Sequence, residues 1–280
     1  MEGFAAQGPL LFAHRGAPGE QPENTLPAFR TALARGADVL ELDVRMSADG
    51  HVFVSHDASG ARVFGVDQAL SSSRFAQIKH WGKKNSQGEI CEPATLAEVL
   101  EAFPHVALNV DVKQEKPDML TPLFDEIMGH AAEERVLLTS FSARVLSRIR
   151  ALNYQGPLGM SRLDAALFLL GPRLPRVLPR RGAQRLQIPL HYGRLNLATR
   201  GCIEKAHAAG LLVDYWVVND PAEAERLLDL GADGIVTDDP GRISEVFARH
   251  VRTRGWRSRQ NPDHSRSIIT IAAPKPVHDR

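Results

Sequence analysis

The strongest constraint on the fold is a serial alternation of short, β-rich apolar runs with segments of helical periodicity. Eight such strand–helix units follow one another along the chain. Strands joined in this way run parallel, because each helix returns the chain to the same end of the sheet. Eight is also the number of units that closes a (β/α)8 barrel, which is the fold class we predict. An open doubly wound sheet is the alternative, although no Gly-x-Gly-x-x-Gly follows the first run to support it.

The expected elements can be given by residue range. The strands are expected at 10–13, 39–45, 106–112, 135–140, 157–160, 186–190, 213–218 and 234–237. The helices are expected at 26–35, 96–103, 119–131, 143–152, 164–169, 197–209, 221–230 and 242–249.

Two segments after the second strand break this alternation. Residues 51–55 alternate like a strand and follow an Asp49-Gly50 turn, which predicts a hairpin extension of the second strand, with a ninth element in the barrel wall as the alternative. Residues 58–92 then show weak periodicity over a length that exceeds an ordinary loop. In a barrel we expect this insertion to lie over the top face, where it would shape the substrate site.

The remaining bulk features predict a cytoplasmic enzyme domain with a tail. Residues 1–250 form the expected catalytic barrel, and 251–280 form a basic C-terminal tail that we expect to be flexible. A minority of such tails bind anionic membrane surfaces or nucleic acid, so a weak membrane contact stays open, as does the oligomeric state. The net charge of +1 gives no reason to expect a nucleic-acid partner. No run approaches the ~20 apolar residues of a membrane span, and we see no signal peptide.

A pair of acids marks the second strand. Glu41 and Asp43 are two residues apart, so their side chains leave the same face, about 6–7 Å apart along the backbone. Like charges held this close, away from water, need a cation or a raised pKa. Oxygen ligands of this kind suit Mg²⁺ or Ca²⁺, and salt bridges to neighbouring basic residues are the alternative.

The third strand repeats this geometry. Asp111 and Lys113 face inward together with Asn109, so a third carboxylate and a fixed positive charge are expected at a similar depth. The combination predicts a metal site with a counter-charge for phosphate, and a purely structural Asp–Lys pair is the alternative.

Two histidines lie where strands end. His14 ends the first strand and His56 follows the hairpin strand, which suggests an acid–base pair that works near neutral pH. Arg15 offers a planar, permanent charge for phosphate oxygens. Trp216 would face inward and contact substrate, or else belong to the core.

These residues lie in motifs that resemble the glycerophosphodiester phosphodiesterase family. The resemblance covers roughly residues 10–250 and follows the family's order. Its segments are 13–16 (AHRG), 22–29 (PENTLPAF), 36–44 (GADVLELDV), 49–50 (DG), 56–57 (HD), 109–113 (NVDVK), 140–141 (SF), 216–219 (WVVN) and 231–238 (GADGIVTD).

The resemblance implies a TIM barrel that hydrolyses glycerophosphodiesters to glycerol 3-phosphate and an alcohol. It implies a divalent metal, Mg²⁺ or Ca²⁺, on Glu41, Asp43 and Asp111, and His14 and His56 as the acid–base pair. It also implies that Arg15 and Lys113 contact the phosphate. The family usually has Glu where this chain has Asp111, whereas the related spider-toxin phospholipases D use Asp.

Two alternatives remain open at this stage. A lysophospholipase D would perform the same chemistry on a diester that keeps an acyl chain, and an apolar groove formed by residues 58–92 would favour it. A catalytically inactive barrel retained for binding is the non-enzyme alternative, although every charged position of the motif is filled by a competent residue. The headgroup, the metal and the division of roles between the histidines are not set by the sequence.

Overall fold

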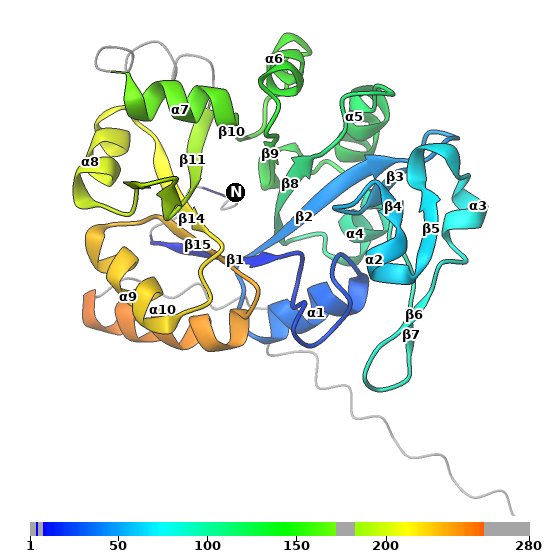
Figure 1. The fold of residues 1–280 in the computed structure, drawn as a ribbon, viewed down its shortest axis with the longest axis horizontal. Coiled ribbons are helices and arrows are strands. Elements are labelled where there is room, and N and C mark those ends of the chain that lie inside the picture. The colour runs from blue at the N-terminus through cyan, green and yellow to red at the C-terminus, as the bar shows by residue number, and fades with distance from the viewer. Residues whose placement is uncertain (1–3, 5–7, 172–182, 255–280) are drawn as a thin grey trace, which may run out of the picture.

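Eight parallel strands close into a barrel in the computed structural model, which describes residue 4 and residues 8–171 and 183–254 (Figure 1). The order around the barrel is β1, β2, β8, β9, β10, β11, β14 and β15, and β1 pairs with both β15 and β2. The bounds are β1 Leu10–His14, β2 Val39–Met46, β8 Ala107–Val112, β9 Val136–Thr139, β10 Leu158–Gly159, β11 Ala183–Pro189, β14 Leu212–Trp216 and β15 Gly234–Thr237. The barrel prediction is therefore confirmed, and the open sheet is excluded because β1 has a neighbour on each side.

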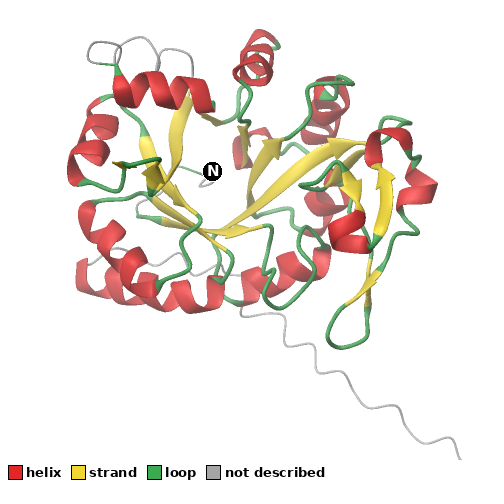
Figure 2. Ribbon diagram, viewed as in Figure 1, coloured by secondary structure: helices red, strands yellow, loops and turns green. Residues whose placement is uncertain are grey.

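Helices surround the strands (Figure 2). They are α1 Leu26–Ala34, α4 Leu96–Ala102, α5 Leu120–Gly129, α6 Ala143–Ala151, α7 Arg162–Leu170, α8 Arg200–Ala208, α9 Pro221–Leu230 and α10 Pro240–Arg254. Six of them begin directly after a polar residue whose side chain accepts a backbone N–H of the first turn: Thr25, Thr95, Ser142, Ser161, Thr199 and Asp220. These caps satisfy donors that a helix start leaves without partners, so the helices start at defined residues.

Side-chain alternation along the strands separates the core from the site. Leu40, Leu42 and Val44 of β2 are buried among the apolar residues of the surrounding helices. Glu41 and Asp43 lie between them in sequence and point into the barrel, as expected from the two-residue period of a strand. Since β2 and β8 pair with Asp43 opposite Asp111, the acids of both strands reach the same level.

The opposite end of the barrel is filled by apolar side chains and contains a buried ion pair. Phe4 packs there with Leu10, Phe12 and other apolar side chains of the strand starts. Above this layer Arg185 of β11 pairs with Asp214 of β14, and the two side chains are 1% and 0% exposed. This end is therefore a packed core, and the chemistry is confined to the ends where the strands finish.

The two interruptions after β2 have separate structures. Residues Val52–Val54 form β3, which pairs antiparallel with β2, so the predicted hairpin extension is confirmed. The insertion then packs against this hairpin through Phe53, Leu70, Ile78 and Trp81. It contains β4 Ser59–Gly60, α2 Ala61–Phe64, β5 Val66–Ala69, a 3-10 turn at Leu70–Ser72, α3 Phe75–Ile78, β6 Lys83–Lys84 and β7 Ile90–Cys91.

The last helix extends the barrel domain beyond the expected boundary. The sequence places that boundary at residue 250, whereas α10 continues to Arg254. The rest of the basic tail, residues 255–280, lies outside the described residues. Of the helices described, none combines the length and the apolar character that crossing a bilayer requires.

Candidate active site

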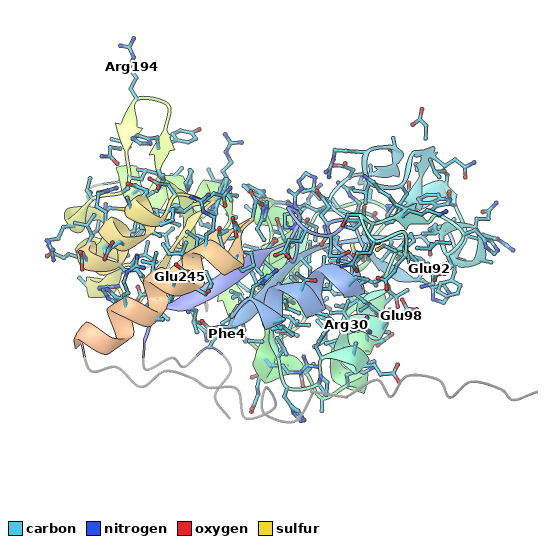
Figure 3. All side chains as sticks on the ribbon, turned by 90° about the horizontal axis from the view of Figure 1, so that it is seen from below. Phe4, Arg30, Glu92, Glu98, Arg194 and Glu245 are labelled. Carbon is cyan, nitrogen blue, oxygen red and sulfur yellow. The ribbon has the colours of Figure 1, made fainter. Side chains whose placement is uncertain are left out.

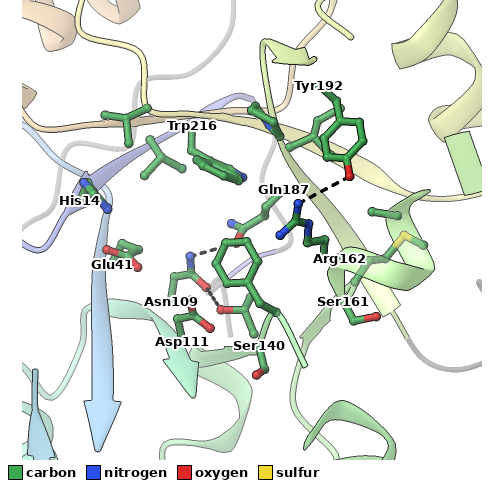
Figure 4. A pocket seen from close by; sticks show the side chains of 18 of the residues that line it. His14, Glu41, Asn109, Asp111, Ser140, Ser161, Arg162, Gln187, Tyr192 and Trp216 are labelled. Atoms are coloured by element: carbon green, nitrogen blue, oxygen red, sulfur yellow. Dashed lines mark hydrogen bonds between the residues drawn. The ribbon is translucent and has the colours of Figure 1, made fainter. Parts of the chain in front are cut away.

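A cavity of about 530 Å³ opens at the ends of the barrel strands and collects most of the residues singled out from the sequence. His14, Arg15, Glu41, His56, Asp111, Lys113 and Trp216 all line it. Asp43 is the exception, because its side chain is 1% exposed and lies below the lining. It forms ion pairs with Arg15 and Lys113, which do line the cavity. Figure 4 shows His14 and Glu41 on one side of this cavity and Arg162 and Tyr192 across from them.

Three buried acids and two cations form the charged part of the site. The Lys113 Nζ atom lies 2.9 Å from Asp43 Oδ1 and 2.6 Å from Asp111 Oδ2. The Arg15 Nε atom lies 3.2 Å from Asp43 Oδ2, which also accepts a hydrogen bond from Asn24 Nδ2 at 3.0 Å. Glu41 accepts only the backbone N–H of Arg15, at 3.0 Å, among these groups.

This unequal supply of cations separates the pKa values of the acids. Burial, together with the charge of Asp43, raises the pKa of Glu41 to about 8. Burial raises the pKa of Asp111 more than Lys113 lowers it. Burial also acts on Asp43, but Lys113 and Arg15 outweigh it, so the pKa of that carboxyl falls below its ordinary value. Asp43 is thus the carboxyl of the group that ionises most readily, and Glu41 holds a proton near neutral pH.

The donor set suits a hard divalent cation in its chemistry. All three side chains are carboxylates, and the buried Asp111 Oδ1 has no hydrogen-bond partner. Lys113 lies between Asp43 and Asp111, however, and no group of three or more metal-ligating side chains in the described ranges is already arranged around one point. A metal would therefore take over the role of counter-ion that the Lys113 ammonium fills here.

Each histidine is oriented by a carboxylate. His14 Nδ1 lies 2.7 Å from Asp238 Oδ1, and Asp238 is held in turn by Asn219 Nδ2 at 2.9 Å. Burial lowers the pKa of His14, but the hydrogen bond to Asp238 and the charge of Glu41 outweigh it and the net shift is upward. His56 Nδ1 lies 2.8 Å from Asp57 Oδ1. Both rings are thereby fixed through Nδ1, which leaves each Nε2 for the cavity.

The turn after β1 brings Arg15 to the acids. Arg15 and Gly16 adopt φ values of 58° and 90°, and a Cβ on Gly16 would lie 2.8 Å from atoms of Ala28. This turn directs the Arg15 side chain inward, where Nη1 also meets Glu23 Oε1 at 3.1 Å. Glu23 and Asn24 of the PENT segment therefore position the charged residues, a role that the sequence did not reveal.

The insertion touches the site at its edge. Arg62 of α2 bonds Asp57 through Nε at 2.6 Å and Glu23 through Nη1 at 2.6 Å. None of the residues that line the cavity belongs to the range 58–92, so these bonds of Arg62 are the contact described between the insertion and the site. The hydrophobic contact with β3 holds the insertion beside the hairpin.

An apolar wall continues the cavity away from the charges. Trp216 contacts Phe141 edge to face, with ring centroids 5.9 Å apart, and Lys113 Nζ lies 5.1 Å from the Phe141 ring centroid. Beyond them the lining comes from α7, the end of β11, and a hairpin of β12 His191–Tyr192 and β13 Leu195–Asn196. Its members are Met160, Ala165, Ala166, Leu169, Ile188, Pro189, Tyr192, Leu195 and Leu197. This wall was not predicted from the sequence, because its residues come from several elements and share no local motif.

Comparison with known proteins agrees with this geometry. A lysophospholipase D of Rattus norvegicus is 29% identical over 267 residues, which covers 84% of this chain and 85% of that protein. A glycerophosphodiester phosphodiesterase of Caldanaerobacter subterraneus subsp. tengcongensis is 27% identical over 248 residues, with 86% and 98% covered.

A solved structure shares the fold. The phosphodiesterase of Oleispira antarctica, in complex with the product sn-glycerol-3-phosphate, superposes with a TM-score of 0.74 at 22% identity, covering 88% of this chain and 100% of that one. The family model described as the glycerophosphoryl diester phosphodiesterase family matches residues 14–242, from the first site histidine into α10. The chain belongs to the glycerophosphoryl diester phosphodiesterase family.

Proposed function

We propose that this chain hydrolyses glycerophosphodiesters to glycerol 3-phosphate and an alcohol, with a divalent metal and with His14 and His56 as the acid–base pair. The observation that carries the proposal is that two histidines, each fixed through Nδ1 by a carboxylate, line one cavity with Arg15, Lys113 and buried acids. The names of the relatives support the same reaction for this chain.

Each group has a role that follows from its position. One histidine takes the proton of the attacking water or substrate hydroxyl, and the other protonates the departing alcohol oxygen. Arg15 and Lys113 offset the charge that grows on the phosphate oxygens. Trp216 and Phe141 form the wall beside these groups.

Glu41, Asp43 and Asp111 are the side chains that would hold the metal. When bound, Mg²⁺ or Ca²⁺ supplies a Lewis acid for a phosphate oxygen. With a metal as the counter-ion of Asp43 and Asp111, the Lys113 ammonium, which lines the cavity, would be available to the phosphate.

A lysophospholipase D activity is the second candidate, and the apolar wall favours it. An acyl chain needs a long apolar surface, which the residues of α7 and the β12–β13 hairpin supply. The relative from Rattus norvegicus carries that name.

The test is product release by the purified protein from glycerophosphocholine and from lysophosphatidylcholine, in EDTA and after Mg²⁺ or Ca²⁺ is returned. We expect glycerol 3-phosphate from the first substrate, stopped by EDTA and restored by one of the metals. Lysophosphatidic acid from the second substrate would establish the lysophospholipase reaction. His14→Ala and His56→Ala should each lower kcat by about 10²–10⁴-fold, and full activity in both would refute the acid–base assignment.

A further inference from the structure

Exposed apolar side chains gather around the mouth of the cavity. Eight large apolar residues are strongly exposed in the described chain, and five of them lie on or beside the apolar wall. Phe141, Tyr192 and Leu195 line the cavity, while Leu163 and Leu167 lie on α7 next to lining residues. Isolated exposed apolar residues are ordinary, but such a grouping at the entrance of a site marks a contact surface.

Leu163 and Leu167 form a stripe on one face of α7. They are four residues apart, so their side chains lie one above the other along the helix, and they are 58% and 44% exposed. Neither lines the cavity, so catalysis inside it does not account for them. The other face of α7 packs inward through Phe168, which is fully buried.

The β12–β13 hairpin continues this surface outward. Figure 3 shows the hairpin projecting from the molecule with Arg194 at its tip, on the side away from Phe4 and thus at the open end of the barrel. Tyr192 connects the hairpin to α7, since its hydroxyl lies 3.5 Å from Arg162 Nη2 and its ring centroid 5.7 Å from the guanidinium carbon. Arg162 precedes Leu163 in α7, so the apolar stripe begins beside the residue that the hairpin contacts.

Exposed arginines flank this apolar surface, and Glu223 of α9 lies near the hairpin at His191. Residues 141–171 and 183–200 contain a single acid, Asp164, which is 6% exposed and hydrogen-bonded to Ser161. Arg162 and Arg194 are both exposed there. Apolar side chains flanked by arginines complement a surface that presents acyl chains below anionic headgroups.

We propose that α7 and the β12–β13 hairpin form a docking face for an anionic phospholipid surface, placed so that a lipid-borne diester enters the cavity without crossing water. Leu163, Leu167, Tyr192 and Leu195 contact the acyl layer, while Arg162 and Arg194 contact headgroup phosphates. Binding of this face to a membrane does not depend on the proposed function, whereas the delivery of a lipid-borne substrate to the cavity does.

The test compares three proteins on vesicles of phosphatidylcholine mixed with phosphatidylglycerol, in a co-sedimentation assay at low and high salt. The double variant Leu163→Gln, Leu167→Gln should bind at least roughly tenfold more weakly than the unaltered protein, because the apolar burial of two leucine side chains in the acyl layer is lost. Ile90→Gln is the matched control, since Ile90 is 64% exposed on β7, in the insertion beside β3. It should bind vesicles as the unaltered protein does.

Turnover on soluble and lipid-borne substrates separates the two proposals. The double variant should hydrolyse glycerophosphocholine normally but lose activity on lysophosphatidylcholine in vesicles. Vesicle binding that depends on the two leucines would support the docking face. Absence of diester hydrolysis in the same protein would refute the proposed function and leave the docking face supported. Three outcomes would overturn the docking face: no vesicle binding, equal binding by the double variant, or a dimer in sedimentation velocity that the double variant abolishes.

Discussion

Replacing Asp238 by Asn tests the orientation of His14 directly. The Asp238 carboxylate contributes one charge-assisted hydrogen bond of 2.7 Å to His14 Nδ1, and such bonds are worth about 1.5–3 kcal/mol. At 1.36 kcal/mol per factor of ten, this corresponds to about 10- to 150-fold in rate. The Asp238 side chain is 39% exposed, and solvent screening reduces the contribution, so we expect kcat to fall by about 10- to 30-fold with KM nearly unchanged.

The pH dependence of the same variant identifies the role of His14. Asp238 raises the pKa of His14, so Asp238→Asn should move the His14 limb of the kcat profile to lower pH. A shift of the acid limb would make His14 the base, and a shift of the alkaline limb would make it the acid. Steady-state kinetics on glycerophosphocholine from acid to alkaline pH measure both quantities.

The control for this experiment is Asp239→Asn. Asp239 is the next residue and accepts the backbone N–H of Arg242 at the start of α10, so it takes no part in orienting His14. The reasoning is refuted if Asp238→Asn keeps the kcat and the pH profile of the unaltered enzyme, or if Asp239→Asn changes them equally.

Three further predictions concern stability. Asp214→Ala leaves Arg185 buried without a counter-ion, so urea unfolding followed by circular dichroism should show a loss of about 3–5 kcal/mol, and a loss below ~1 kcal/mol would contradict the buried-pair account. Gly16→Ala places a Cβ 2.8 Å from Ala28 at a φ of 90°, so the thermal midpoint should fall and kcat with it; an unchanged midpoint would contradict the close approach. The pKa of Glu41 is about 8 in the folded protein and has its ordinary value in the unfolded chain. Between about pH 4.5 and pH 8 the unfolded chain therefore loses the Glu41 proton while the folded protein keeps it. This difference lowers the free energy of unfolding as the pH rises through that range. In EDTA, Glu41→Gln should therefore melt higher than the unaltered protein at pH 8 and equally at pH 4, and a lower melting point at pH 8 would refute this.

The sequence predicted the barrel and the inward-facing acids because both follow from the short repeats of apolar residues along strands and helices. The two-residue alternation of β2 and β8 assigns each side chain to a face, and neighbouring strands then bring Asp43 and Asp111 to one level. Periodicity does not mark where a helix starts: α7 begins at Arg162, two residues before the expected start, because Ser161 caps it.

Contacts between distant residues could not be predicted in this way. His14 and Asp238 are 224 residues apart, and they meet only because β15 pairs with β1. The weak periodicity of residues 58–92 does not show that Phe53, Leu70 and Trp81 share one small core. The apolar wall was missed because inward-facing apolar residues at the end of a strand have the same pattern as core residues.

The pairing of β15 with β1 also determines when the His14–Asp238 contact can form during synthesis. During synthesis the ribosome releases His14, Arg15 and all three acids long before Asp238, Asn219 and the final strand emerge. The ring of His14 acquires its partner at the same event that closes the barrel. A nascent chain that stops before β15 thus carries the three acids and both histidines, but it lacks the Asp238 carboxylate that orients His14 and the strand that closes the barrel.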